Sequence, residues 1–286
     1  MKNTIKKILK KSFLYPLLSK IKNGKRLKLE ANYNRILSNV VGGNIVVDVK
    51  NIPGNYEFDF RSDILRRILI SKVYEPEIVD AILKNLPENA DAINIGANVG
   101  LYTNLLAQNM KNNKVLAIEP TKSAYNLLTR NIERNNNKEN VITFKGIISD
   151  VKGNFTINTV VGKEEYSSIG NLVHTSINEE PYETEEISGI TLDELTQEHK
   201  LNPKLLVIDV EGAEYKVLKG AKKTLEKSQP IIISELDDKL LVAQETDSKE
   251  IISFLEALNY EVKDVDGGKI QYPFTGNIIA KSKSNS

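Results

Sequence analysis

The sequence contains no cysteine and no tryptophan, and only two histidines and two methionines among its 286 residues. Without cysteine, the chain forms neither disulfides nor a thiolate zinc site. No apolar run approaches the ~20 residues that a transmembrane helix requires. The apolar stretch 13–18 is short, contains Pro16 and is followed by no small-residue cleavage pattern, which argues against a signal peptide. We therefore expect one large cytoplasmic domain with embellishments.

Charge is distributed unevenly, although the formal net charge is only +1. Residues 1–30 carry nine lysines and Arg26 against the single acid Glu30, a charge of +9 that leaves −8 for the remainder. An acidic body argues against a nucleic-acid groove, so we expect no nucleic-acid partner. The basic segment places its apolar residues on one helical stripe. This pattern fits either a peripheral helix, residues 1–22, on the anionic cytoplasmic face of a membrane or a solvated leader that packs on the domain.

The stretch 91–103 organises the rest of the chain. Residues 91–95 form an apolar run with β-branched residues, which predicts a buried strand. Gly96 and Gly100 bracket a tight turn, and leucines at helical spacing follow from Leu101. A strand, a glycine turn and a helix start are typical of a nucleotide-type site. Glycine lets the backbone approach a ligand, and the first N–H groups of a helix are unpaired.

The next predicted strand ends in an acid. Val115–Ile118 is apolar, and Glu119 follows it about 20 residues past the turn, the spacing of a carboxylate that binds a ribose diol. A dinucleotide site requires G-x-G-x-x-G, whereas the middle position here is Asn98, whose side chain would crowd a pyrophosphate. S-adenosylmethionine fits better, because it carries adenosine and an amino-acid tail but no phosphate. The alternative is an ordinary glycine-rich turn of another α/β protein.

Carboxylates also follow two later apolar strands. Leu205–Ile208 ends in Asp209, with Glu211 and Glu214 close behind, and Glu235 ends the next apolar strand. Three acids at a buried strand end repel one another unless cations or hydrogen bonds compensate, which favours functional use. Two of them could hold the amino group of the cofactor or an acceptor hydroxyl. Magnesium is one possible compensating cation, but no spacing demands it, and we predict no metal site.

The segment 162–189 departs from the alternation of strands and helices. It follows a predicted third strand (141–148) and an added strand (155–160). We interpret it as a substrate lid, because ligands of doubly wound folds bind outside the carboxyl ends of the strands. His174 in this lid is either a general base or an exposed loop histidine. Asp150, just after the third strand, either contacts adenine or belongs to an ordinary Asp-x-x-Gly turn.

Three of these motifs, in order and spacing, resemble the FkbM family of S-adenosylmethionine-dependent methyltransferases, over roughly residues 74–280. They are Ile-Asn-Ile-Gly-Ala-Asn-Val-Gly-Leu-Tyr-Thr (93–103), Ala-Ile-Glu-Pro (117–120) and Val-Ile-Asp-Val-Glu-Gly-Ala-Glu (207–214). The resemblance implies an α/β, Rossmann-like, seven-stranded class I methyltransferase fold with a mostly parallel sheet and helices on both faces. It also implies methylation of a hydroxyl oxygen, typically of a sugar or a polyketide.

Two positions qualify the resemblance. Asn94 stands where the family usually has an aspartate that helps to orient the amino group of the cofactor, so an acceptor oxygen is kept and the charge is lost. Glu75 belongs to a Tyr-Glu pair that the family often carries here. It could reach the cofactor or the acceptor, or serve only as an acid favoured at a helix start.

The predicted cofactor-binding residues surround the first three strand ends: Asn94, Gly96, Asn98, Gly100, Glu119 and Asp150. The predicted catalytic residues are the acids of the fourth and fifth strand ends and the lid histidine: Asp209, Glu211, Glu235 and His174. The expected acceptor is a small molecule or glycan. A non-catalytic module that binds S-adenosylmethionine, or a methyltransferase of protein or nucleic acid, is the alternative.

We divide the chain into a basic leader (1–30), an N-terminal extension (31–73), a methyltransferase domain (74–282) and a disordered tail (283–286). In the extension, residues 44–49 and 56–60 are predicted strands, separated by a turn at 51–54.

Overall fold

The centre of the fold is a seven-stranded sheet. The computed structural model describes residues 24, 28, 43–160, 162–169 and 182–285. The strand order is β12-β13-β11-β10-β3-β4-β5. The strands from β11 to β5 are parallel, and β13 is antiparallel to both of its neighbours. Their bounds are β3 (Asp91–Ile95), β4 (Val115–Ile118), β5 (Val141–Phe144), β10 (Pro203–Ile208), β11 (Ile231–Asp237), β12 (Tyr260–Asp264) and β13 (Thr275–Ser282).

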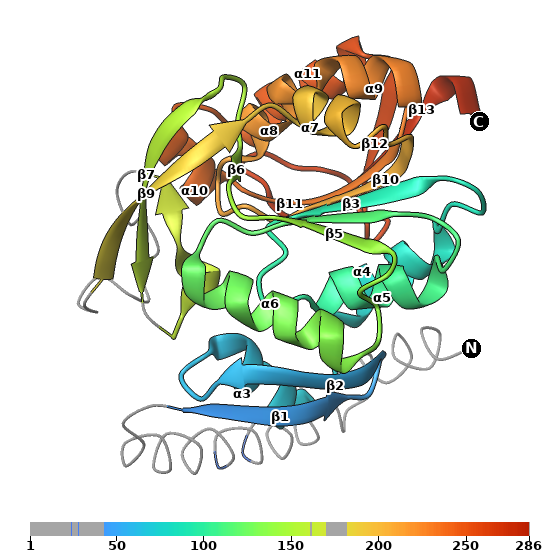
Figure 1. The fold of residues 1–286 in the computed structure, drawn as a ribbon. Helices are drawn as coiled ribbons and strands as arrows, with labels where there is room; N and C mark the ends of the chain where they lie inside the picture. The colour runs from blue at the N-terminus through green and yellow to red at the C-terminus, as the bar shows by residue number, and fades with distance from the viewer. Residues whose placement is uncertain (1–23, 25–27, 29–42, 161, 170–181, 286) are drawn as a thin grey trace, which may run out of the picture.

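Helices cover both faces of this sheet (Figure 1). One face carries α4, α5 and α6, and the other carries α7, α8, α9 and α11. The arrangement confirms the predicted α/β, Rossmann-like fold. Its strand order reverses between β3 and β10, where sheets of this kind bind ligands. The helices are α4 (Pro76–Lys84), α5 (Leu101–Asn109), α6 (Lys122–Arg134), α7 (Leu192–Glu198), α8 (Glu214–Gly220), α9 (Lys222–Ser228), α10 (Asp238–Leu241) and α11 (Ser248–Ala257), with 3-10 turns η3 (Val242–Gln244) and η4 (Lys283–Asn285).

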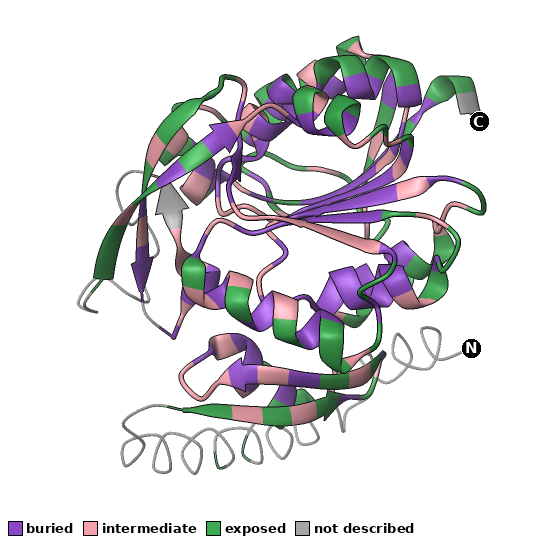
Figure 2. Cartoon of the chain, viewed as in Figure 1, coloured by how far each residue is buried: buried purple, intermediate pink, exposed green. Residues whose placement is uncertain are grey.

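The central strands divide two hydrophobic cores. Successive side chains of a strand point to opposite faces, so Leu205 and Val207 of β10 face the core beneath α4 and α5. Leu206 and Ile208 face the core beneath α8, α9 and α11. Figure 2 shows these strands buried and the outer faces of the helices exposed. Covering on both faces explains why the strands are continuous apolar runs.

The N-terminal extension is a hairpin and a helix that lie below α6 in Figure 1. Strands β1 (Asn44–Val49) and β2 (Ile52–Asp59) pair antiparallel, and α3 (Asp63–Ser71) follows. The predicted turn at 51–54 is too long, because β2 already begins at Ile52. Asn131 of α6 fixes the hairpin. Its side chain accepts from the N–H of Glu57 (2.7 Å) and donates to the carbonyls of Glu57 (3.0 Å) and Val99 (2.9 Å).

A second sheet, with order β6-β9-β7-β8, lies at one end of the main sheet. The predicted third strand 141–148 is wrong, because the chain leaves the main sheet after β5 and pairs again as β6. The crossing needs Gly146, where an added Cβ would lie 2.8 Å from the carbonyl oxygen of Ser188. The strands are β6 (Ile147–Ile148), β7 (Gly153–Val160), β8 (Ser168–Ile169) and β9 (Tyr182–Ile190), with the 3-10 turn η1 (Glu164–Tyr166) between β7 and β8.

The predicted lid is therefore partly a strand. Its last part is β9, which pairs antiparallel with β7. Residues 170–181, which include His174, lie outside the described residues. The tail is also corrected: it forms η4, and the N–H of Lys283 donates to the carbonyl of Asn259 (2.9 Å). After β10, α8 is followed by α9, and Gly220 at the end of α8 approaches the carbonyl of Ser149 too closely for a side chain.

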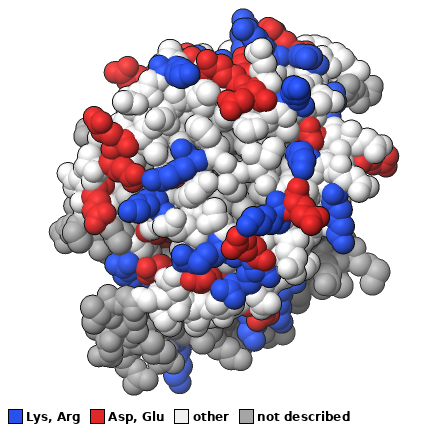
Figure 3. Space-filling view, in the orientation of Figure 1, with Lys and Arg blue, Asp and Glu red and all other residues white. Residues whose placement is uncertain are grey.

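The surface in Figure 3 carries Lys and Arg side chains interspersed with Asp and Glu side chains. Within the described ranges, no helix has the length and apolar character needed to cross a bilayer. Of the basic leader, only residues 24 and 28 are described, so its contact with a membrane stays a prediction. The same holds for the expected lack of a nucleic-acid partner.

Replacing Asn131 by alanine is expected to lower the free energy of unfolding by about 3 kcal/mol, because backbone groups of β2 and of the β3–α5 turn lose their partners. Urea denaturation measures this change. The matched control is Asn126→Ala on the same helix, whose side chain is exposed, with an expected effect within ~0.5 kcal/mol. Equal effects of the two substitutions would show that Asn131 does not hold the hairpin.

Candidate functional site

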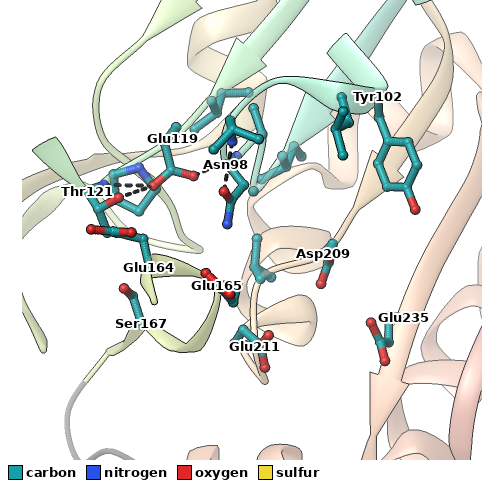
Figure 4. A pocket seen from close by; sticks show the side chains of 18 of the residues that line it. Asn98, Tyr102, Glu119, Thr121, Glu164, Glu165, Ser167, Asp209, Glu211 and Glu235 are labelled. Atoms are coloured by element: carbon teal, nitrogen blue, oxygen red, sulfur yellow. Dashed lines mark hydrogen bonds between the residues drawn. The ribbon is translucent and has the colours of Figure 1, made fainter. Parts of the chain in front are cut away.

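One large cavity opens at the carboxyl ends of the parallel strands (Figure 4). It encloses about 1040 Å³, part of it open to solvent. The wall combines the β3–α5 turn, the ends of β4, β10 and β11, the start of α4, helix α3 and the segment around η1. Segments from seven places in the chain thus converge where the topology predicts a ligand. The predicted site residues that line it are Gly96, Asn98, Glu119, Asp209, Glu211 and Glu235.

The β3–α5 turn and the end of β10 touch through their backbones. Gly96 has φ +81°, and a Cβ there would lie 1.7 Å from the carbonyl oxygen of Asp209. The N–H of Asp209 donates to the carbonyl of Ile95 (3.0 Å). Glycine is therefore required at this position by the approach of β10. This contact places the turn and the acids of β10 in the same wall.

Glu119 holds the β3–α5 turn from the end of β4. Its Oε2 accepts from the N–H of Asn98 (2.9 Å), and its Oε1 accepts from the N–H (2.9 Å) and the hydroxyl (2.6 Å) of Thr121. The side chain is buried at 4% exposure, yet it lines the cavity. Desolvation raises the pKa of Glu119, against the lowering effect of the Thr121 and Asn98 hydrogen bonds. A carboxylate oxygen can accept more than one hydrogen bond, so Oε2 keeps capacity for a ligand hydroxyl.

Three predicted cofactor-binding residues do not line the cavity. Gly100 begins α5, and a Cβ there would meet the Leu128 side chain at 2.7 Å. Asn94 is buried in β3, where it donates to the hydroxyl of Thr103 (2.9 Å). Asp150 pairs with Lys219 (2.9 Å). The predicted binding roles of these three residues gain no support from their positions.

The acids of β10 and β11 gather at the opposite end of the cavity from Glu119 (Figure 4). Within the described part of the chain, the carboxylates of Asp209, Glu211 and Glu235 accept no hydrogen bond and form no ion pair. Burial and then the charges of Glu235 and Glu211 raise the pKa of Asp209 well above its usual range. Burial and the neighbouring carboxylates raise the pKa of Glu211 to about 8. These groups are poised to accept a proton or to bind a cation.

Glu214 belongs to the same motif but plays a different part. Its Oε1 accepts from the N–H groups of Val210 (3.3 Å) and Gly212 (3.2 Å), and its Oε2 has no partner within the described residues. Burial raises its pKa to about 7. The bonds hold a turn in which Glu211 adopts φ +51°. Glu214 thus orients Glu211 from behind the cavity wall.

Sequence reasoning missed the wall contributed by α3 and the start of α4. Arg67 and Tyr74 line the cavity together with Glu75. Glu75 accepts from the hydroxyl of Tyr102 and pairs with Arg67 (3.1 Å). It also stands directly before the first turn of α4, although its side chain makes no capping hydrogen bond. Its place in the cavity lining supports a role in ligand binding, and its place before α4 supports a role as an acid at a helix start. A Tyr-Glu pair before a helix start was the available signal.

The segment around η1 closes the end of the cavity beside Glu119. Glu164 accepts from the hydroxyl of Ser123 (2.6 Å), and Glu165 accepts from the backbone at the start of α3. Desolvation raises the pKa of Glu165 to about 7. Ser167 lines the cavity, and its buried Oγ has no partner within the described residues. No sequence pattern marked these residues, because only the folded insertion brings them beside Glu119.

The described residues contain no group of three His, Cys, Asp or Glu side chains that could hold a metal ion. The carboxylates lie around the cavity rather than converging on one point (Figure 4). An organic ligand that reaches several walls suits this arrangement.

Comparisons with known proteins agree with this geometry. Residues 94–262, more than half of the chain, match the family model of the methyltransferase FkbM domain. Methyltransferase sdnD of Sordaria araneosa is 27% identical over 165 residues, which cover 48% of this chain and 62% of that protein. The chain therefore spans less than two thirds of the length of this relative.

Solved structures with a similar fold include the methyltransferase FkbM from Methylobacillus flagellatus, at 13% identity and a TM-score of 0.45, over 67% of this chain and 43% of that one. The O-methyltransferase from Bacillus cereus, solved with S-adenosylhomocysteine, is 14% identical with a TM-score of 0.39, over 77% of this chain and 96% of that one.

The melting temperature is expected to fall as the pH rises from about 5 to 8. The pKa values of Glu165 and Glu214 (about 7) and Glu211 (about 8) lie above the ordinary 4.5 of an unfolded chain. The folded state therefore binds more protons in this window, and stability falls with pH. Differential scanning calorimetry measures the slope. Glu211→Gln should reduce it, whereas the exposed control Glu226→Gln should not. A slope that Glu211→Gln leaves unchanged would contradict the assignment.

Proposed function

Because the chain belongs to the methyltransferase FkbM family, we propose that it transfers a methyl group from S-adenosylmethionine to a hydroxyl oxygen of a sugar, a glycan or a small natural product. The observation that carries this proposal is the pairing of two ends in one cavity. Glu119 lies at one end, and the unpartnered carboxylates of Asp209 and Glu235 lie at the other. The end with Glu119 suits a ribose diol, and the end with Asp209 and Glu235 suits an acceptor that loses a proton.

The residues present fit the cofactor. Glu119 keeps an oxygen with hydrogen-bonding capacity toward the cavity, and Ser167 Oγ is buried there without a described partner. Both would bind the nucleoside. Asn98 and Gly96 form the adjoining wall, where the amino-acid part would lie.

The chemistry needs little from the protein beyond alignment and proton acceptance. When bound, S-adenosylmethionine supplies a methyl carbon that is already electrophilic because it is bonded to a positively charged sulfur. The O–C bond forms as the C–S bond breaks, and the hydroxyl proton passes to a carboxylate. Asp209 and Glu235 are the candidates, since burial and their mutual repulsion raise the pKa of Asp209, and burial and Glu75 raise that of Glu235. A base with a pKa nearer the working pH is more efficient.

Glu119→Ala is expected to weaken binding of S-adenosylhomocysteine by about 1–3 kcal/mol, because ligand hydroxyls lose a charged acceptor. Isothermal titration calorimetry on the full chain measures this loss. Glu139→Ala, at an exposed loop position, is the matched control and should bind like the wild type. Circular dichroism must show that both variants are folded.

Two outcomes would contradict the proposal. Folded wild-type protein that binds neither S-adenosylmethionine nor S-adenosylhomocysteine would favour a non-catalytic module. Unchanged affinity in folded Glu119→Ala would place the nucleoside elsewhere.

A further inference from the structure

We propose that the acceptor carries a protonated amine beside the hydroxyl that is methylated, as amino sugars and other amino alcohols do, and that the acids at the β10–β11 end of the cavity bind this ammonium group. The inference rests on the proposed function and deepens it by naming the acceptor class. The ammonium would anchor the acceptor, while the neutral hydroxyl remains the nucleophile.

The charge of the cavity carries the first step. Its described lining holds seven carboxylates and one guanidinium, that of Arg67. Arg67 is already paired with Glu75 (3.1 Å). The cofactor would add a sulfonium, an ammonium and a carboxylate, one net positive charge, and could not balance the remainder. An anionic acceptor would meet like charge, whereas a cationic one would relieve the repulsion.

The carboxylates differ in how the protein uses them. Those of Glu119, Glu164 and Glu165 accept hydrogen bonds from neighbouring backbone or hydroxyl groups. Those at the opposite end, Asp209 and Glu235, accept none from the described residues. One ammonium group, that of the cofactor, cannot reach every acid at this end. Charge-assisted hydrogen bonds from a second ammonium would satisfy the others.

Tyr74 provides an independent observation at the same place. Its side chain is only 5% exposed, lines the cavity, and forms no hydrogen bond through its hydroxyl within the described residues. Tyr74 shares the lining of the cavity with Asp209 and Glu235, and its ring centroid lies 5.7 Å from that of Tyr102. The Arg67 guanidinium lies over the Tyr74 ring, 5.7 Å from its centroid, so this aromatic wall already holds one organic cation. Aromatic rings beside carboxylates are surroundings in which proteins bind organic ammonium groups.

Space continues beyond these acids. A small recess lined by Glu75, Tyr102, Asp209 and Glu235 leads from the main cavity to Asn277 of β13, with room for about one water molecule. The body of an acceptor larger than a single functional group would therefore lie in the main cavity. A metal ion fits less well, because its oxygen ligands must converge at 2.0–2.6 Å and the described residues offer no such group.

The test measures binding of three probes of one shape to the full chain saturated with S-adenosylhomocysteine: glucosamine, glucose and glucuronate. Saturation-transfer NMR at constant ionic strength, at a pH where the amine is protonated, gives their dissociation constants. Glucosamine should bind at least about ten-fold more tightly than glucose, and glucuronate most weakly. Glu235→Gln should reduce the preference for glucosamine without changing the affinity for S-adenosylhomocysteine. Glu226→Gln, the same charge change at an exposed position, should leave both unchanged.

The outcomes separate the two proposals. Equal binding of glucosamine and glucose, tighter binding of glucuronate, or no detectable glucosamine binding overturns the ammonium site while leaving the methyltransferase proposal intact. A preference that survives in both Glu235→Gln and Asp209→Asn also overturns it. A third contrary outcome is that magnesium abolishes the preference for glucosamine and tightens the binding of glucose, because the acids would then bind a metal ion rather than an ammonium group. Failure to bind S-adenosylhomocysteine at all is the separate failure of the proposed function.

Discussion

The contact between Gly96 and the backbone of Asp209 is the constraint on which the site depends. Because no side chain fits between them, the β3–α5 turn and the end of β10 lie directly against each other. This approach sets the turn and the acids that follow β10 in one wall of the cavity. Glu119 then reaches across from β4 to hold the turn through Asn98. Backbone packing alone thus defines where the two ends of the cavity lie.

That geometry has an electrostatic cost. Parallel strands end at one edge of the sheet, so the acids that follow β10 and β11 gather there with no described cation closer than Arg67, which pairs with Glu75. Burial and repulsion raise the pKa of Glu211 to about 8 and that of Asp209 well above its usual range. A site of this kind is less stable empty than filled by positive charge, and binding then strengthens the fold. The repulsion that destabilises the folded protein also raises the affinity of these acids for protons.

The sheet and its motifs could be predicted from sequence because their signals are local. Apolar runs mark β3, β4 and β10, and glycines and acids mark their ends. The errors lie where tertiary packing decides: the predicted strand 141–148 is interrupted near Gly146, where the backbone of Ser188 approaches too closely for a side chain. Ser167 carries no local signal, since it becomes a site residue only when the insertion folds over the strand ends, whereas Tyr74 was marked only by the Tyr-Glu pair before a helix start. His174 lies outside the described residues, so its role stays a prediction.

The family match begins at residue 94, yet the wall of the cavity begins thirty residues earlier in the chain, at Ile64 of α3. The matched residues contain Glu119, Asp209 and Glu235, whereas α3 and the residues just before α4 contribute a further wall of the cavity. A fragment cut at the bounds of the match would lose Arg67 and Tyr74. Such a fragment would keep the acids at the strand ends but would expose their cavity to solvent on the side that α3 covers.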